Sequence, residues 1–166
     1  MTLAVTDANI FIDLFELKLL SLFFELDLDI YTTQEVLLEC DKIQREQLQL
    51  FIKNKKLIVK NISDADALKM ESMTFNKGLS EPDKSVLFVA KNENGMVISG
   101  DKLIRKWCQK NKIEVHGILW VLDEINQAQL ISSQEVIEKL ETLLQFNFWL
   151  PTIAANELLE RWRKEL

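Results

Sequence analysis

The sequence contains few of the residues that break, bend or cross-link a chain. Its 166 residues include four glycines, two prolines and two cysteines. This scarcity excludes collagen-like and low-complexity chains and indicates regular secondary structure joined by short loops. Because 48% of the residues are hydrophobic and 28% are charged, the chain has the composition and length of one globular domain with a substantial core.

Cysteine, histidine and long apolar runs are also scarce. Cys40 and Cys108 lie in amphipathic stretches, so we expect buried free thiols in a reducing compartment. His116 is the only histidine and has no candidate nucleophile near it, which favours a structural role and disfavours Ser–His and Cys–His hydrolysis. No stretch approaches the roughly 20 apolar residues of a membrane span, and the N-terminus has no secretion signal. We therefore expect a cytoplasmic protein without a membrane partner.

Positive charge is in deficit, because 26 acidic residues outnumber 20 lysines and arginines and give a net charge of −6 at pH 7. Proteins that bind nucleic acids usually have a basic surface, so the overall charge opposes that function. One local stretch is basic and could hold an RNA backbone, although a solvated helix face is its simpler explanation. Its residues are Lys102, Arg105, Lys106, Lys110 and Lys112.

Short apolar runs alternate with helical periodicity over residues 1–117. The predicted strands are Leu3–Thr6, Ile30–Thr32, Leu57–Val59, Met96–Ser99 and Ile113–His116. Alternating strands and helices predict a parallel sheet covered on both faces.

Helix-start patterns place the predicted helices of this part. The Thr32–Glu35 capping box is expected to start a helix that includes Phe51. Ser63 starts another helix, which Gly78 is expected to end. Ser80–Asp83 starts a third, with proline in its first turn.

From Ile118 onward the pattern is helical only, and no linker separates this part from the rest. We therefore expect a single domain over residues 1–166, with an α/β core over 1–117 and a helical extension over 118–166. The helices predicted in the extension are Ile118–Ile125, Ser133–Phe146 and Thr152–Arg163.

Two aspartates directly follow predicted strands. Asp7 follows Leu3–Thr6, and Asp101 follows Met96–Ser99 across Gly100. Ligands of open parallel sheets bind beyond the carboxyl ends of the strands, where the strand order reverses. The two aspartates meet there if their strands are neighbours, although each also has an ordinary explanation as a turn or helix-cap residue.

Two further acids lie on or beside the apolar faces of predicted helices. Asp83 is in the first turn of its helix, and Glu39 lies at the edge of an apolar face. An unpaired buried carboxylate is costly, so such residues need a partner. Asp83 can instead complete a capping box with Ser80, and Glu39 can pair with Lys42 or Arg45 on a solvated face.

A cluster of four carboxylates needs compensation. Two unit charges 4 Å apart repel by about 4 kcal/mol at an effective dielectric constant near 20. A divalent cation relieves this repulsion, and ligands that are all oxygen favour Mg²⁺ or Mn²⁺ over zinc. Because such an ion activates water and neutralises phosphate charge, converging carboxylates favour hydrolysis of a phosphate ester.

Four segments, taken in order, resemble the motifs of the PIN-domain superfamily of nucleases, which includes the VapC toxins of bacterial toxin–antitoxin pairs. They are Val5–Leu14, Val36–Glu39, Gly78–Asp83 and Val97–Lys102, and each contains one of the four acids. The stretch from Glu114 through the last helices resembles a PIN branch with a helical C-terminal extension. The likeness covers nearly the whole chain.

The resemblance implies a three-layer α/β/α sandwich with a helical extension. It implies Mg²⁺- or Mn²⁺-dependent endonucleolytic cleavage of RNA by a toxin with a cognate antitoxin. The implied metal-binding and catalytic residues are Asp7, Glu39, Asp83 and Asp101. Ser99 and Asn9 occupy positions where relatives carry polar residues that support the site.

The chain departs from this pattern in two places. No extra acid follows Asp101 within Lys102–Arg105, and Lys84 stands where a small residue is common. The missing acid and the negative net charge keep open a catalytically silent PIN-fold module that binds protein or RNA. A phosphatase of the haloacid-dehalogenase kind is a third alternative, but its motif requires a second aspartate where Asn9 stands.

Large apolar residues are expected mainly in the core. Leu19–Phe24 favours burial in the core, with contact to a second copy or another protein as the alternative. The four tryptophans lie in helical patterns, so core or interface positions are expected rather than base-stacking positions. They are Trp107, Trp120, Trp149 and Trp162.

Overall fold

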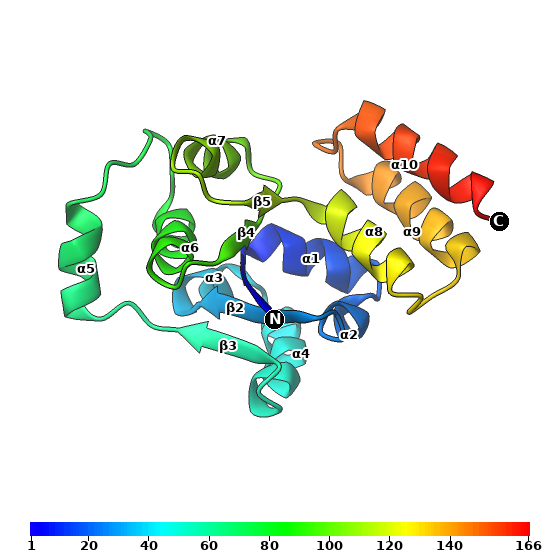
Figure 1. The fold of residues 1–166 in the computed structure, drawn as a ribbon. Helices are drawn as coiled ribbons and strands as arrows, with labels where there is room; N and C mark the ends of the chain where they lie inside the picture. The colour runs from blue at the N-terminus through cyan, green and yellow to red at the C-terminus, as the bar shows by residue number, and fades with distance from the viewer.

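A five-stranded sheet forms the centre of the computed structural model, which describes residues 1–166 (Figure 1). The strands lie in the order β3-β2-β1-β4-β5, and every neighbouring pair is parallel. The predicted parallel sheet is therefore confirmed. The strands are β1 (Thr2–Thr6), β2 (Leu28–Thr33), β3 (Leu57–Lys60), β4 (Met96–Ile98) and β5 (Val115–His116).

Helices connect the parallel strands and cover both faces of the sheet. In Figure 1, α6 and α7 lie on one side of β4 and β5, and α1 and α8 lie on the other. The fold is thus the expected three-layer α/β/α sandwich. Its helices up to α8 are α1 (Ala8–Glu16), α2 (Leu20–Phe23), α3 (Gln34–Glu39), α4 (Lys42–Lys53), α5 (Asp64–Glu71), α6 (Glu81–Asn92), α7 (Lys102–Lys110) and α8 (Ile118–Gln127).

The strand order reverses beside β1. The chain proceeds outward from β1 through β2 to β3, then crosses back through α5 and α6 to add β4 on the other side of β1. The register pairs Thr6 of β1 with Ile98 of β4. The residues that follow these two strands are therefore neighbours at the carboxyl edge of the sheet, as the sequence predicted.

The helix expected from Thr32 to Phe51 is instead two helices. Thr33 caps α3, accepting a hydrogen bond from the Val36 amide at 3.2 Å, while the Thr32 hydroxyl donates to the Thr6 carbonyl at 2.8 Å. The chain is extended at Cys40, and Asp41 starts α4 with its own capping box. The prediction was wrong because helical periodicity continues across this interruption, and the competing cap at Asp41 stops the first helix.

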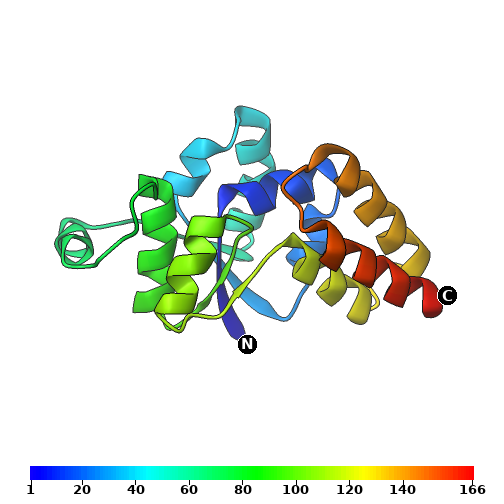
Figure 2. The same cartoon turned by 90° about the horizontal axis from the view of Figure 1, so that it is seen from above.

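The position of Gly78 was also predicted wrongly. The helix that Ser63 starts, α5, ends at Glu71, and no residue of α5 is buried. Figures 1 and 2 show α5 projecting from the rest of the molecule on its two connections. Gly78, with φ +97°, lies in the turn that leads to Ser80 at the start of α6. Glycine is favoured at this position because its backbone is left-handed, although no helix ends there.

The helical extension packs at the other end of the molecule. Helices α8, α9 (Ser133–Phe146) and α10 (Thr152–Lys164) contact one another, as Figures 1 and 2 show. Two hydrogen bonds tie α9 and its end to the region of α1. The Lys139 ammonium donates to the Leu17 carbonyl at 2.7 Å, and the Asn147 amide donates to the Asp13 carboxylate at 3.1 Å. A single cluster of buried apolar residues runs from β1 to α10.

Most of the apolar residues predicted in the core are buried. Within Leu19–Phe24, the residues Leu19, Leu20, Phe23 and Phe24 are buried, so the core interpretation of that stretch is confirmed. Both cysteines are free and buried. Trp107 and Trp162 are buried, but Trp149 is 89% exposed and has no place in the core. No helix combines the length and the apolarity needed to cross a membrane.

The Thr33 hydroxyl should contribute to stability, because it caps α3 and also forms a 2.7 Å hydrogen bond with Ser85 of α6. We expect Thr33→Ala to lower the free energy of unfolding by about 1–3 kcal/mol, measured by urea denaturation. Thr33→Ser keeps the hydroxyl and is the control. Equal losses in the two variants would contradict the role given to the hydroxyl.

Candidate active site

Asp7 is held at the point where β1 becomes α1. Its backbone amide donates to the Ile98 carbonyl of β4 at 3.3 Å, which extends the β1–β4 pairing by one bond. Its Oδ1 atom accepts a hydrogen bond from the Ile10 amide at 3.1 Å and so caps α1. The residue is only 5% exposed. A buried carboxylate is thus fixed at the carboxyl edge of the central strand.

Ser99 joins the two aspartates that follow β1 and β4. Its hydroxyl donates a short hydrogen bond to Oδ2 of Asp7 and accepts one from the Asp101 amide at 3.1 Å. Asp101 in turn caps α7 by accepting from the Ile104 amide at 2.9 Å. Ser99 is fully buried, and its two hydrogen bonds fix Asp7 relative to the backbone of Asp101.

Asp83 and Glu39 enter the site from α6 and α3. Asp83 forms a capping box with Ser80, with hydrogen bonds of 3.0 and 3.2 Å, so its ordinary structural explanation also holds. Glu39 is the last residue of α3 and is exposed. The alternative pairing of Glu39 with Lys42 or Arg45 is absent, since no ion pair joins these residues.

The four carboxylates affect one another electrostatically. Burial raises the pKa of Asp7 to about 7; hydrogen bonds from Ser99 and Ile10 oppose this rise, and the charges of Asp83 and Asp101 add to it. Partial burial raises the pKa of Glu39, and the charge of Asp83 raises it further. The charge of Asp83 therefore acts on both Asp7 and Glu39, and the charge of Asp101 acts on Asp7.

The donor set matches a hard divalent cation in its chemistry. The helix caps occupy Oδ2 of Asp83 and Oδ1 of Asp101, which leaves a second carboxylate oxygen on each residue. All available donors are oxygens, as Mg²⁺ and Mn²⁺ prefer. No group of three or more His, Cys, Asp or Glu side chains lies close enough together to hold a metal ion. The structure thus links Asp7 and Asp101 through Ser99 and relates Asp83 and Glu39 to them by charge, without assembling a metal-binding group.

The basic and polar residues predicted around the four acids differ in their exposure and in their contacts with the site. Arg105 is half-buried on α7, where its guanidinium donates to the Ser99 carbonyl at 3.4 Å and pairs with no carboxylate. Lys102 and Lys106 are exposed on the same helix. Asn9 is exposed on α1 and forms no side-chain hydrogen bond. Arg105 is therefore the predicted basic residue that the structure brings into contact with the site.

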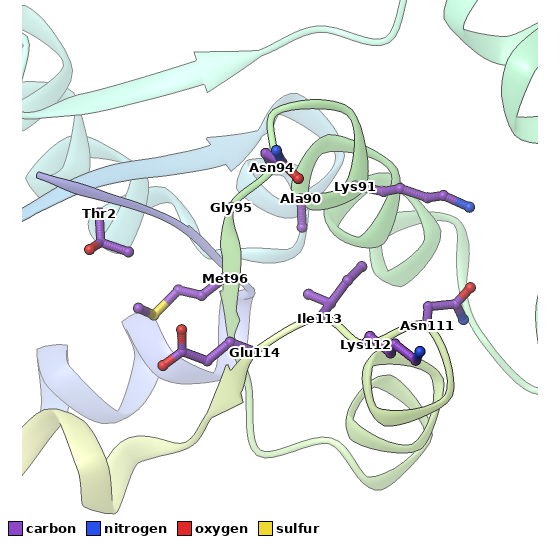
Figure 3. A pocket seen from close by; sticks show the side chains of 10 residues that line it. All are labelled: Thr2, Ala90, Lys91, Asn94, Gly95, Met96, Asn111, Lys112, Ile113 and Glu114. Carbon is purple, nitrogen blue, oxygen red and sulfur yellow. The ribbon is translucent and has the colours of Figure 1, made fainter.

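A hollow in the molecule lies away from these acids. It has a volume of about 290 Å³ and is lined by residues such as Thr2, Met96 and Glu114 (Figure 3). Thr2 and Met96 begin β1 and β4, and Glu114 precedes β5. This hollow is therefore at the amino edge of the sheet, opposite the carboxylates, and is not part of the candidate site.

His116 and Lys84 have local partners. The His116 ring forms a 2.8 Å contact with the Glu114 carboxylate and stacks on Trp120 at 4.4 Å between ring centroids. Lys84 forms an ion pair with Glu81 at 3.3 Å. Neither contact involves a serine or a cysteine, so neither forms a Ser–His or Cys–His pair.

Comparison with protein families identifies the architecture around these acids. Residues 3–164 match the family DUF3368, which is described as a PIN domain. The chain belongs to this PIN domain family. The match includes the α/β sheet, all four acids and the helical extension, so the extension is part of what defines this PIN domain.

Two solved structures are similar to this chain at low sequence identity. A PilT N-terminus domain protein from Sulfolobus solfataricus P2 is 14% identical, with a TM-score of 0.49, over 75% of this chain and 93% of that one. VapBC2 from Rickettsia felis, solved with a DNA fragment from their promoter, is 13% identical, with a TM-score of 0.42, over 70% and 98%. No curated protein matches the chain.

The buried position of Asp7 predicts a pH-dependent stability for the metal-free PIN domain. Burial raises the pKa of Asp7 from its ordinary value of 3.8 to about 7. Between these two pH values the native state therefore holds a proton on Asp7 that the unfolded state has lost. The Asp7 contribution to the free energy of unfolding therefore falls as pH rises through this window. We expect Asp7→Asn to gain stability over wild type across it, by up to about 4 kcal/mol.

Urea denaturation between pH 4 and 8, with a chelator present, measures this difference. Asp29→Asn alters an exposed aspartate of β2 and is the matched control, which should follow the wild-type profile. A stability difference between Asp7→Asn and wild type that stays constant with pH would contradict the prediction.

Proposed function

We propose that this PIN domain is a divalent-metal-dependent endoribonuclease and the toxin component of a bacterial type II toxin–antitoxin system. The observation that carries the proposal is the link between Asp7 and Asp101 through Ser99 at the carboxyl edge of β1 and β4, with the charge of Asp83 acting on Asp7 and Glu39. This edge is where ligands bind in open parallel sheets. Membership of the PIN domain family supports the nuclease class.

Each acid has a distinct part in the proposed site. Asp7, oriented by Ser99, provides the most buried carboxylate, and Asp101 and Asp83 each keep a free oxygen at a helix start. Glu39 is the most exposed of the four and closes the site from α3. A bound Mg²⁺ or Mn²⁺ would supply an activated water and neutralise charge on the scissile phosphate.

Arg105 provides positive charge next to the acids. Its guanidinium has no carboxylate partner, and its contact with the Ser99 carbonyl directs it toward the strand ends. Guanidinium groups bind phosphates with paired hydrogen bonds. Arg105, with Lys102 and Lys106 farther out, would hold the RNA backbone. This local arrangement offsets a net charge of −6 that otherwise opposes RNA binding.

The toxin role and a protein antitoxin rest on the resemblance to VapC-like toxins. Two buried free thiols agree with action in the reducing cytoplasm. A second copy of the chain is a further proposed partner. Growth arrest when the protein is expressed in bacteria, relieved by Asp101→Asn, tests the toxin role separately from RNA cleavage.

A catalytically silent PIN module that binds protein or RNA is the second candidate. The open carboxylate arrangement and the absence of an acid in Lys102–Arg105 favour it. Titration calorimetry with Mn²⁺ separates the two, because a silent module of this kind shows no saturable metal binding.

Asp101 is the best position to test catalysis, because asparagine also caps helices well. We expect Asp101→Asn to keep the fold but to lower the rate of Mg²⁺- or Mn²⁺-dependent RNA cleavage by about 100-fold or more. Cleavage of a labelled RNA, followed on denaturing gels, measures the rate.

Asp41→Asn is the matched control for this test. Asp41 caps α4 with a 2.8 Å hydrogen bond from the Gln44 amide, so the same substitution tests the capping role alone. It should leave cleavage unchanged. RNA cleavage by Asp101→Asn at the wild-type rate would contradict the proposed metal-dependent mechanism.

Arg105 should affect RNA binding more than the chemical step. We expect Arg105→Ala to raise the KM for RNA by about 10-fold and to reduce the slope of log affinity against log salt by about 0.7, the value of one phosphate contact. Lys56→Ala, which alters an exposed lysine in the turn before β3, is the control. An unchanged slope in Arg105→Ala would exclude a phosphate contact.

A further inference from the structure

The turn between α9 and α10 exposes large aromatic side chains. Phe148 is 85% exposed and Trp149 is 89% exposed, with Ile153 at 78% and Phe146 at 40% beside them in the chain. No charged residue occurs between Glu141 and Glu157. Scattered exposed apolar residues are normal, but adjacent ones of this size usually mark a binding site.

The backbone of this turn is fixed although its aromatic rings are exposed. The Asn147 carbonyl oxygen Oδ1 accepts a hydrogen bond from the Trp149 amide at 3.1 Å. The Asn147 backbone amide donates to the Leu143 carbonyl at 2.8 Å, and its side-chain amide donates to Asp13 at 3.1 Å. A rigid backbone that presents exposed rings lowers the entropy lost when a ligand stacks on them.

The turn is anchored beside the candidate active site. Asp13 lies on α1 six residues after Asp7, which corresponds to about 9 Å along the helix axis. Figures 1 and 2 both show the α9–α10 turn alongside α1. With about 3.4 Å per nucleotide in a stacked strand, 9 Å corresponds to roughly three nucleotides. Asn147, directly before the two rings, is therefore held on the helix that Asp7 caps, a few nucleotide lengths along the helix axis from Asp7.

We propose that Phe148 and Trp149 form a stacking platform for bases of the RNA strand that flank the cleaved phosphodiester. The inference rests on the proposed ribonuclease function and adds a substrate-binding site on the helical extension. Aromatic side chains bind single strands by stacking on bases with little sequence preference. Arg105 would hold the phosphates near the acids, and the neutral rings would hold the neighbouring bases.

Position and size favour an RNA strand over a protein at this turn. A stable protein interface buries about 800 Å² on each partner, whereas the exposed apolar residues here are confined to one turn and the start of α10. The turn also carries no charge that would repel a phosphate backbone. Contact with a second copy of the chain is an outcome that the experiment separates.

Fluorescence anisotropy with a labelled single-stranded RNA tests the platform. The Asp101→Asn background prevents cleavage during the measurement, and the salt concentration is varied. We expect the double variant Phe148→Ala, Trp149→Ala to bind RNA at least about 10-fold more weakly, with an unchanged slope of log affinity against log salt. The conservative pair Phe148→Tyr, Trp149→Phe should restore most of the affinity.

Leu68→Ala is the matched control, because Leu68 is 68% exposed on α5 and should not affect RNA binding. Equal affinity in the alanine pair and the background overturns the platform. Equal affinity together with lost self-association, measured by sedimentation, assigns the turn to an interface between copies and also overturns it. A reduced salt slope overturns stacking as the cause.

Failure of the proposed function gives a different result. If the background protein binds no RNA and the wild type cleaves none, the ribonuclease proposal fails and the platform fails with it. If the wild type cleaves RNA and the alanine pair binds and cleaves equally well, only the platform fails.

Discussion

The hydrogen bond from Ser99 to Asp7 is the interaction on which the candidate site depends. It joins the ends of β1 and β4, the two strands between which the sheet reverses its order. A carboxylate buried to this extent without hydrogen bonds would be costly, and Ser99 together with the Ile10 amide offsets part of that cost. Because Ser99 also accepts from the Asp101 amide, the register of the two strands fixes the relative positions of both aspartates.

Three of the four acids have structural and proposed catalytic roles at the same time. Asp7 and Asp101 cap α1 and α7, and Asp83 completes the capping box of α6. Helix starts carry partial positive charge, which stabilises a carboxylate there. In a parallel sheet the helices that follow β1 and β4 begin at the same edge, so their caps converge. Local folding rules thus gather negative charge at this edge of the sheet.

The sequence predicted the features that depend on short-range patterns. Asp7 and Asp101 were recognisable because each follows an apolar run, and the adjacency of β1 and β4 brought them together. The break at Cys40 was missed because helical periodicity continues on both sides of Asp41. The exposure of Trp149 was missed because an apolar residue in a helical pattern does not show whether another element covers it. Arg105 could have been ranked above its basic neighbours, since it lies four residues after Asp101 on the same helix face.

The long separation of Ser99 and Asp7 in the chain has a consequence for biosynthesis. The two residues are 92 positions apart, and β1 is central in the sheet although it is the first strand made. Closing so long a loop costs conformational entropy, and this cost slows the formation of contacts between residues far apart in the sequence. A nascent chain on the ribosome therefore carries Asp7 for most of its synthesis without the strand that completes the site. Any activity of the four acids begins only after β4 has emerged and inserted beside β1.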